Sequence, residues 1–526
     1  MDRTQRITLI ATGLGLFMIF LDALIVNVAL PAIQTNFSVG EAGLQWVVAA
    51  YSLGMAVFIM TGATLADLHG RRRWYLIAIV VFTLASVACG LAPSLPILNF
   101  ARGVQGLAAA TANVTSLAIV SHAFPDPKQK ARAIGIWTAI ASVGTAVGPT
   151  LGGFLVEHFS WRSIFLVNVP FGIIVVLLTL RYVAESRDER PRTLDSVGQA
   201  LFMVTVGALA YAVIEGPKSG WTSPLILGLF AIAAIGTFTF IRYELRSGDP
   251  MMDLTLFRDP AYSVAIGTIC TVFFSIYGML LLVTQFLQNV RGYSPEQTGI
   301  MILPFSLSVT IVSPLVGRLI GRFGARGPIL IGIATMILGL LGLIAAGQNN
   351  PVIVLAGLGL AGTGGALCLT PITTLAMTSV PAQRAGMASG IMSAQRAIGS
   401  TVGFAVLGSV LAAWLAATLE QDLATVIADS AERRAVASAI VASANPRAHV
   451  AEIGPSHPIT HSHPPTRAAI VAVAERDFIN GIRVSLAVAV ALLFVALVIG
   501  WRYFPRGGGA MSDAEHEAAK LATSEE

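Results

Sequence analysis

The chain has 526 residues, of which only 12% are charged and 55% are hydrophobic, and its mean hydropathy is +0.76. An average soluble domain carries about 25% charged residues, so this chain has too little charge to cover the surfaces of several soluble domains. Its net charge of +5 lies in arginines and lysines beside apolar segments, which indicates membrane topology, and no nucleic-acid partner is expected.

The apolar residues form blocks, and we expect an all-α membrane protein with about fourteen transmembrane helices. A helix rises 1.5 Å per residue, so about 20 apolar residues cross a hydrocarbon core of roughly 30 Å. Only helices and closed barrels satisfy their backbone groups in that core, and the period-two alternation of barrel strands is absent. The predicted spans are residues 7–31, 43–66, 74–92, 96–121, 133–156, 164–182, 195–215, 223–243, 262–288, 298–320, 328–347, 352–378, 388–416 and 482–503.

The first predicted span imitates a secretory signal peptide, because basic residues precede an apolar run and residues 29–32 resemble a cleavage site. The apolar run over residues 7–30 is too long for such a signal, and it contains Asp22. We therefore expect an uncleaved helix.

The basic clusters all fall on one side of the membrane if the predicted spans are right. They lie at residues 71–73, 128–132, 187–192, 318–326 and 502–506. Positively charged loops stay in the cytoplasm. We therefore expect a multi-pass protein of the plasma (inner) membrane of a bacterium, with both termini cytoplasmic.

One long hydrophilic stretch, residues 417–481, falls on the opposite, external face. Its mixed charge and a segment rich in proline and histidine predict a loop that is partly disordered. His457, His461 and His463 lie in it, but a flexible loop is favoured over a metal site. Cys89, Cys270 and Cys368 lie in apolar segments without metal-ligand spacing, so no metal is expected.

The sequence repeats itself with an offset of 255 residues. Residues 62–71 (GATLADLHGR) resemble residues 317–326 (GRLIGRFGAR), and a glycine pattern at 135–148 matches one at 390–403. Two separate motifs at one offset predict two related six-helix halves with two helices inserted between them. The predicted parts are an N-terminal half 1–182, the inserted helices and linkers 183–258, a C-terminal half 259–503 that includes the 417–481 loop, and a cytoplasmic tail 504–526.

Five motifs resemble the major facilitator superfamily, and in particular its fourteen-span drug:proton antiporter branch. They are residues 21–31 (LDALIVNVALP), 62–72 (GATLADLHGRR), 102–106 (RGVQG), 144–153 (GTAVGPTLGG) and 161–170 (WRSIFLVNVP). Leu68 and Ser163 depart from the pattern, because many members carry a basic and an aromatic residue there. Over its whole length the chain is similar to actinobacterial spectinomycin–tetracycline efflux transporters.

The resemblance implies two parallel halves around a site near the bilayer midplane, which open alternately to the two sides. It implies export of small-molecule drugs, tetracycline-like or aminocyclitol-like, in exchange for protons. The expected partners are drugs, protons and the lipid bilayer, with the proton-motive force in place of a cofactor and no enzymatic activity. Two alternatives stay open: transport of another small metabolite, and a membrane receptor on a transporter scaffold.

Asp22 lies about two-thirds of the way along the first predicted span. A carboxylate at that depth costs about 2.5–3.5 kcal/mol on insertion scales unless it is protonated, paired or hydrated. In the fourth span Asn99, Arg102 and Gln105 are spaced i, i+3 and i+6, and so polar a face must point into the bundle. We predict that Asp22 and Arg102 couple proton movement to transport. A structural carboxylate and a network that only fixes packing are the alternatives.

The loop after the second span predicts a conformational latch formed by Gly62, Asp67, Gly70, Arg71 and Arg72. Glycine lets the turn approach a neighbouring helix closely. The Asp67 carboxylate is expected to cap or neutralise a helix N-terminus across the interface. A role of the arginines in topology alone is the alternative.

In the fifth span Gly144, Gly148 and Gly152 recur every four residues and form a smooth stripe for helix contact. Pro149 removes a backbone hydrogen bond and can kink the helix. We predict a seam on which the two halves rock against each other. Plain close packing is the alternative.

Spans nine to thirteen carry no Asp or Glu, so the second half is expected to contact the substrate. Arg396 is expected to pair with backbone or loop groups, and the role of Glu215 stays open. A GxGxxG pattern at residues 357–362 lies inside an apolar span with no strand before it, which indicates helix packing and not a nucleotide site. The candidate cavity residues are Asn27, Asn99, Gln105, Tyr277, Gln285, Gln288 and Gln395.

Overall fold

The computed structural model describes residues 2–187, 193–248, 250–346, 350–380, 385–443 and 464–505, which form helices and no strand. Fourteen of the described helices are long and apolar enough to cross a membrane, as the sequence predicts. The helices of the first half are α1 (Arg3–Phe37), α2 (Glu41–His69), α3 (Arg71–Gly90), α4 (Leu95–Ala123), α5 (Pro127–His158), and α6 (Ser163–Leu166) continued by α7 (Asn168–Tyr182).

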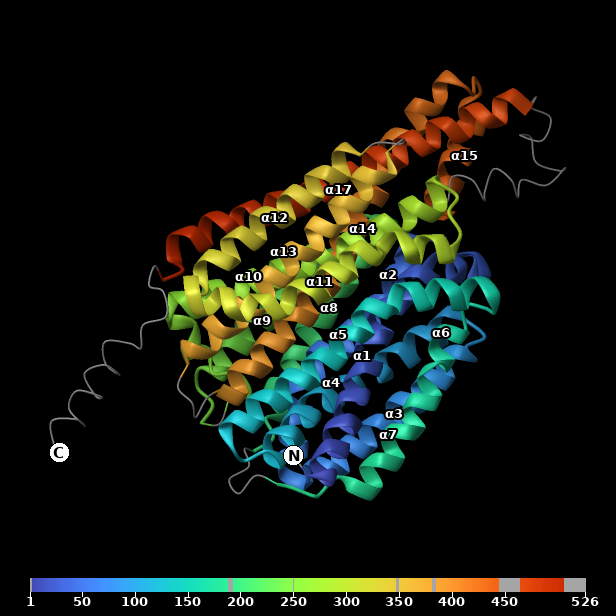
Figure 1. Ribbon diagram of the computed structural model, residues 1–526. Coiled ribbons are helices and arrows are strands. Elements are labelled where there is room, and N and C mark those ends of the chain that lie inside the picture. Colours follow the sequence, from blue (N-terminus) through green and yellow to red (C-terminus); the bar gives the residue numbers. More distant parts are fainter. Residues whose placement is uncertain are drawn as a thin grey trace, which may run out of the picture.

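The remaining helices belong to the same bundle (Figure 1). Two inserted helices come first, α8 (Ser196–Ser219) and α9 (Pro224–Glu244), before the short η1 (Leu254–Arg258). The second half contains α10 (Pro260–Gln285) with a π-helical turn η2 (Phe286–Val290), α11 (Pro295–Phe323), α12 (Arg326–Ala345), α13 (Pro351–Thr378), α14 (Ala385–Asp422), η4 (Leu423–Thr425), α15 (Ser430–Ser443) and α17 (Pro464–Tyr503).

Local signals fix where several helices begin. Asp2 and Gln5 form a capping box at the start of α1, and Ser294 and Gln297 form another at the start of α11. Each box satisfies two backbone N–H groups that have no partner inside the helix. Proline stands in the first turn of α4, α5, α9, α10, α11 and α13, where its missing N–H costs nothing. The predicted span boundaries agree with these starts to within a few residues.

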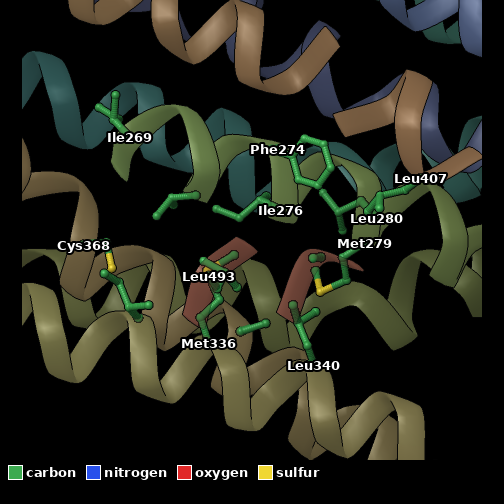
Figure 2. Close-up of a cluster of buried hydrophobic side chains, with 14 of the residues drawn as sticks. Ile269, Phe274, Ile276, Met279, Leu280, Met336, Leu340, Cys368, Leu407 and Leu493 are labelled. Carbon is green, nitrogen blue, oxygen red and sulfur yellow. The ribbon is translucent and has the colours of Figure 1, made fainter. Parts of the chain in front are cut away.

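The two halves repeat one another in their packing. α1 packs on α5, α2 on α4, and α3 on α4 and α7, while α10 packs on α14, α11 on α13, and α12 on α13 and α17. These are equivalent pairs if each helix of the second half stands for its counterpart in the first. The structure therefore confirms two six-helix repeats. Side chains from α10, α12, α13 and α17 fill the core of the second half (Figure 2), among them Ile269, Met336, Cys368 and Leu493.

The halves meet along two helix pairs, α5 with α11 and α2 with α14. The inserted helix α8 packs against both members of the second pair, and α9 packs on α8. Polar contacts fix α8 in place, because Gln199 accepts a hydrogen bond of 2.5 Å from Thr61 and Glu215 accepts one of 2.9 Å from Trp46. The insertion thus covers the α2–α14 side of the interface.

The stretch predicted as a loop, residues 417–481, is largely helical where the structure describes it. α14 continues to Asp422, α15 forms a separate helix, and α17 begins at Pro464. Apolar residues spaced by four, such as Val436 and Ile440 or Ile470 and Ala474, pack into a small core of their own. The prediction missed this because charged residues between them lower the mean hydropathy. The three histidines of the stretch lie outside the described residues.

The bundle has two distinct ends. α1 begins and α17 ends at the end opposite α15 (Figure 1). We call the first the basic end, because Arg71–Arg73 and Arg326 lie there, and the second the α15 end. Arg326 donates a hydrogen bond of 2.6 Å to the carbonyl oxygen of Trp501, which places the start of α12 beside the end of α17.

Candidate functional site

The site begins with an ion pair between α1 and α4. The Asp22 carboxylate and the Arg102 guanidinium are 2.5 Å apart, and both side chains are fully buried. Two further side chains donate to Asp22 Oδ1, each at 2.9 Å: the amide of Gln105 and the amide of Asn168. An acceptor with three donors, one of them charged, is well satisfied in its ionised form.

The network reaches five of the seven helices of the first half, α1, α2, α3, α4 and α7. Gln105 also donates to the Ser86 hydroxyl at 2.7 Å, and Arg102 Nε donates to the carbonyl oxygen of Val47 at 3.1 Å. Sequence reasoning identified Asp22, Arg102 and Gln105 but gave no role to Asn168 and Ser86. Asn168 was detectable as a polar residue inside an apolar span, although nothing in the sequence shows that it faces Asp22.

A cavity lies between the two halves and encloses about 660 Å³, counting its open mouth. Helices α1, α2 and α4 supply one wall, and α10 and α14 supply the other. Its lining residues are Ile19, Phe20, Ala23, Val48, Tyr51, Ser52, Met55, Asn113, Phe273, Tyr277, Ser393, Arg396, Ala397 and Ser400.

Tyr51 connects the cavity with the buried ion pair. It lines the cavity, and the centroid of its ring lies 4.3 Å from the guanidinium carbon of Arg102. Its hydroxyl donates to the carbonyl oxygen of Ile19 at 3.3 Å, which holds the ring between the cavity and the Asp22–Arg102 pair. Asp22 and Arg102 are therefore not on the cavity wall but directly behind it.

Of the seven candidate cavity residues, only Tyr277 lines the cavity. The other six lie elsewhere, because the sequence shows that a residue is polar but not which way its helix is rotated. Gln105 belongs to the ion-pair network. Asn27 donates a hydrogen bond to the carbonyl oxygen of Leu24 on its own helix, and Gln285 is fully buried. Gln288 donates at 2.9 Å to the carbonyl oxygen of Val28, so it joins the two halves. Asn99 and Gln395 are partly buried and lie outside both the network and the lining.

Arg396 differs from its prediction. Its guanidinium donates at 2.9 Å to the hydroxyl of Thr373 on α13, and it lines the cavity beside Phe273. It was expected to bind backbone or loop groups. The sequence does not show that Thr373 of the neighbouring helix α13 lies within reach of this guanidinium.

The loop motif contacts the end of α7. Glu185 accepts from the backbone N–H groups of Arg72 and Arg73 at 3.0 and 3.2 Å, and so caps the start of α3. Asp67 was expected to cap a helix, but its carboxylate binds Arg71 at 2.8 Å. Gly70 has a φ of +112°, and a Cβ there would lie 2.8 Å from the Glu185 carboxyl carbon, so only glycine fits this turn.

Gly62 and Arg72 of the loop motif also contact other helices of the first half. A Cβ on Gly62 would come within 2.6 Å of the Thr111 hydroxyl, so this glycine lets α2 approach α4. Arg72 also donates to the carbonyl oxygen of Leu180 at 2.7 Å. These contacts fasten the loop within the first half, and its action as a latch across the interface stays a prediction.

The glycine stripe of α5 does not lie between the halves. A Cβ on Gly144 would be 2.5 Å from the carbonyl oxygen of Phe17, and one on Gly152 would be 2.7 Å from Ile25. Gly148 faces Leu24. The stripe therefore packs α5 on α1 of the same half, and the prediction of a seam between halves at these three residues is wrong. They face α1 because the intra-half neighbour lies on that side of α5.

The contact between halves uses the neighbouring residues of α5. A Cβ on Gly153 would collide with the carbonyl group of Pro295, and one on Gly299 with the carbonyl group of Pro149. These residues lie at the α15 end. Towards the basic end, Gly135 of α5 and Gly321 of α11 have no atom within 4 Å of a Cβ position. The α5–α11 pair is thus in close contact at the α15 end, whereas Gly135 and Gly321 have open space beside them towards the basic end.

Two six-helix repeats with a cavity between them and a buried ion pair at membrane depth define the class of secondary transporters. A family model described as Major Facilitator Superfamily matches residues 12–404. The chain belongs to the major facilitator superfamily.

Named relatives cover nearly the whole chain. It is 66% identical over 506 residues to Multidrug resistance protein Stp of Mycobacterium tuberculosis (strain ATCC 25618 / H37Rv), with 96% of this chain and 93% of that protein covered. It is 44% identical over 507 residues to Drug efflux pump JefA of the same strain, with 96% and 99% covered. It is 31% identical over 499 residues to the Tetracenomycin C resistance and export protein of Streptomyces glaucescens, with 94% and 90% covered.

A solved structure shares the fold. It is a bacterial homolog of the human lysosomal transporter Spinster, in an inward-facing and unoccupied conformation, and it matches with a TM-score of 0.63 and 19% identity. The match covers 96% of this chain and 99% of that one. At this identity the likeness concerns the fold alone.

Proposed function

We propose that this chain is a proton-coupled exporter of drugs that works by alternating access. The observation that carries the proposal is the Asp22–Arg102 pair, which lies behind the wall of the central cavity and is separated from it by Tyr51. A titratable carboxylate so close to the cavity allows a proton and a substrate to influence each other. The names of the relatives support drugs as the substrate class.

The proposed cycle starts with the α5–α11 pair in close contact at the α15 end, as Gly153 against Pro295 and Gly299 against Pro149 show. In the first state of the proposed cycle the cavity is open to the basic end, and the Asp22 carboxylate accepts hydrogen bonds from three side chains. Substrate enters the cavity, the α5–α11 pair closes at the basic end, and the α15 end opens. Asp22 then takes a proton from that side, which releases Arg102, and it loses the proton again after the return to the first conformation.

The direction of export depends on orientation. We place the basic end in the cytoplasm, because clustered arginines are retained there, and we place the protein in the plasma membrane of a bacterium. Both termini are then cytoplasmic, and α15 is external. The proton-motive force is the only energy source that the cycle uses. Tetracycline-like and aminocyclitol-like compounds are the two substrate groups proposed.

The test uses purified protein in liposomes with an imposed pH gradient. We expect uphill movement of a fluorescent drug only when the gradient is present, and dissipation of the gradient when the drug is added. Asp22→Asn is the matched variant, and it should allow at most downhill movement. Uphill transport without a proton gradient would exclude coupling, and movement of the drug in the direction of the protons would favour a symporter.

A further inference from the structure

Arg396 is the one charged side chain among the described residues that line the central cavity. Its Nη2 binds the hydroxyl of Thr373, whereas its Nε is buried without a hydrogen-bond partner. A guanidinium carries five N–H donors and stays protonated in proteins. Arg396 therefore brings a permanent positive charge with unused donors to the cavity.

No carboxylate lies on α10 or on α14 before Glu420, the two helices of the second half that line the cavity. The sequence from Gln297 to Leu419 contains no Asp or Glu at all. In the first half and the insertion, Asp22 is engaged by Arg102, and Glu215 accepts from Trp46. The polar side chains among the described lining residues are otherwise neutral: Tyr51, Ser52, Asn113, Tyr277, Ser393 and Ser400.

The remaining wall is aromatic. Phe20 and Tyr51 lie on the first half, and Phe273 and Tyr277 lie on the second, with their own rings stacked at a centroid distance of 5.9 Å. Aromatic walls with a few placed hydroxyl groups are suited to planar ring systems that carry polar substituents. The guanidinium lies beside Phe273, with 5.8 Å between its central carbon and the ring centroid.

We propose that Arg396 selects the charge of the substrate, so that the cavity takes aromatic molecules that carry an anionic oxygen. A guanidinium binds carboxylates and other oxyanions through parallel N–H donors. A cation in the same place meets a like charge in a medium of low dielectric constant. This inference rests on the proposed function and narrows it, since tetracycline-like rings with an acidic oxygen fit the cavity better than aminocyclitols with ammonium groups.

A purely structural role for Arg396 makes a different prediction. If the guanidinium only joins α14 to α13 through Thr373, its loss weakens binding of all ligands alike. If it selects charge, its loss removes the difference between anionic and neutral ligands of the same shape. The ratio of two affinities therefore separates the two roles, whereas a single affinity does not.

The experiment measures binding of three fluorescent probes to the purified protein in detergent. They are anthracene-9-carboxylate, its methyl ester, and an anthracenylmethyl-trimethylammonium cation, which share one ring system and differ in charge. One charge-assisted hydrogen bond corresponds to about tenfold in affinity or more. We expect the wild type to bind the carboxylate at least about tenfold more tightly than the ester, and the cation most weakly.

Three variants complete the test. Arg396→Gln should bring the carboxylate and the ester to equal affinity, and Arg396→Lys should retain a preference for the carboxylate. Arg291→Gln is the control, because Arg291 packs on Phe286 outside the cavity, and it should leave the preference unchanged. An unchanged preference in a folded Arg396→Gln protein, or a wild type that prefers the cation, overturns the proposal.

Transport in liposomes separates this proposal from the proposed function. If the wild type moves none of the three probes against a gradient when a pH difference is imposed, the proposed function fails. If it moves them with a charge preference that Arg396→Gln does not alter, the exporter stands and the role of Arg396 is refuted. If proton-driven transport of the ester survives in Arg396→Gln while that of the carboxylate falls about tenfold or more, both are supported.

Discussion

Replacing Asp22 by Asn tests the centre of the site, because the substitution keeps the shape of the side chain and removes its charge and its proton. Three groups point donors at this carboxylate: Arg102, Gln105 and Asn168. An asparagine offers one acceptor oxygen and one NH₂ group. One donor of the network then faces another donor, and the guanidinium loses its counter-charge in a site with no exposure to solvent.

The magnitude follows from the burial of both partners. Removing one member of a buried ion pair typically costs about 3–5 kcal/mol, because the other charge is left uncompensated. That is a large part of the roughly 5–15 kcal/mol by which proteins are stable. We expect Asp22→Asn to lower the unfolding temperature clearly and to abolish transport driven by a pH gradient.

The double variant Asp22→Asn with Arg102→Gln distinguishes charge balance from coupling. Removing both charges of a buried pair leaves no uncompensated charge, and apolar replacements of similar volume are often close to neutral for stability. We therefore expect the double variant to recover most of the lost unfolding temperature. Transport should remain lost, because no titratable carboxylate is restored.

The assays are thermal unfolding in detergent and drug transport in liposomes. They are carried out on the wild type, on Asp22→Asn, on Arg102→Gln and on the double variant. Two results would refute the reasoning. Undiminished uphill transport by Asp22→Asn would show that the proton binds elsewhere. Additive losses of stability in the double variant would show that the two side chains do not act as a pair.

Three other predictions concern the interface, the topology and the loop motif. Gly153→Leu should keep α5 from closing on Pro295 at the α15 end, and so stop transport while drug binding persists. Gly135→Leu has open space at its Cβ and should transport normally. Equal behaviour of the two variants in paired binding and liposome assays would contradict this. A cysteine at the exposed Ser438 should react with an impermeant maleimide in intact cells, once access across any outer envelope is confirmed. A cysteine at the exposed Ser196 should react only after permeabilisation, and the reverse pattern would invert the topology. Glu185→Ala should lower the stability measured by thermal unfolding by about 0.5–2 kcal/mol, the usual value of a helix cap. An unchanged unfolding temperature would show that the hydrogen bonds from the backbone N–H groups of Arg72 and Arg73 contribute nothing.

The sequence predicts the membrane spans and the repeat because both depend on local composition. Twenty apolar residues must cross the bilayer as a helix wherever they lie in the fold. The residues of one helix face are also predictable, and this is why Arg102 and Gln105 were expected together and both bind Asp22. A buried carboxylate needs a partner, so the pairing follows from energetics as well as from spacing.

What the sequence does not predict is which neighbour a helix face meets. Gly144, Gly148 and Gly152 were correctly read as a close-packing stripe, but the sequence does not reveal that the facing helix is α1 and not α11. The same limit explains why Tyr277 reaches the cavity and Gln395 does not. Asn168 is a third case, since its role depends on α7 lying beside α1 and α3.

The positions of Arg102 and Arg396 suggest how charge is divided between proton coupling and substrate recognition. Arg102 is matched by Asp22 and does not line the cavity, so in the proposed cycle its charge is released only when Asp22 takes a proton. Arg396 is unmatched and lines the cavity, so its charge is always available to a substrate. An anionic substrate leaving the cell moves with an interior-negative potential, which contributes about 2.3 kcal/mol per charge for each 100 mV. An arginine at membrane depth costs roughly 2.5–3.5 kcal/mol on insertion scales. Its position in the cavity is therefore consistent with a transporter in which the proton gradient acts through Asp22 and the electrical potential acts on the substrate bound at Arg396.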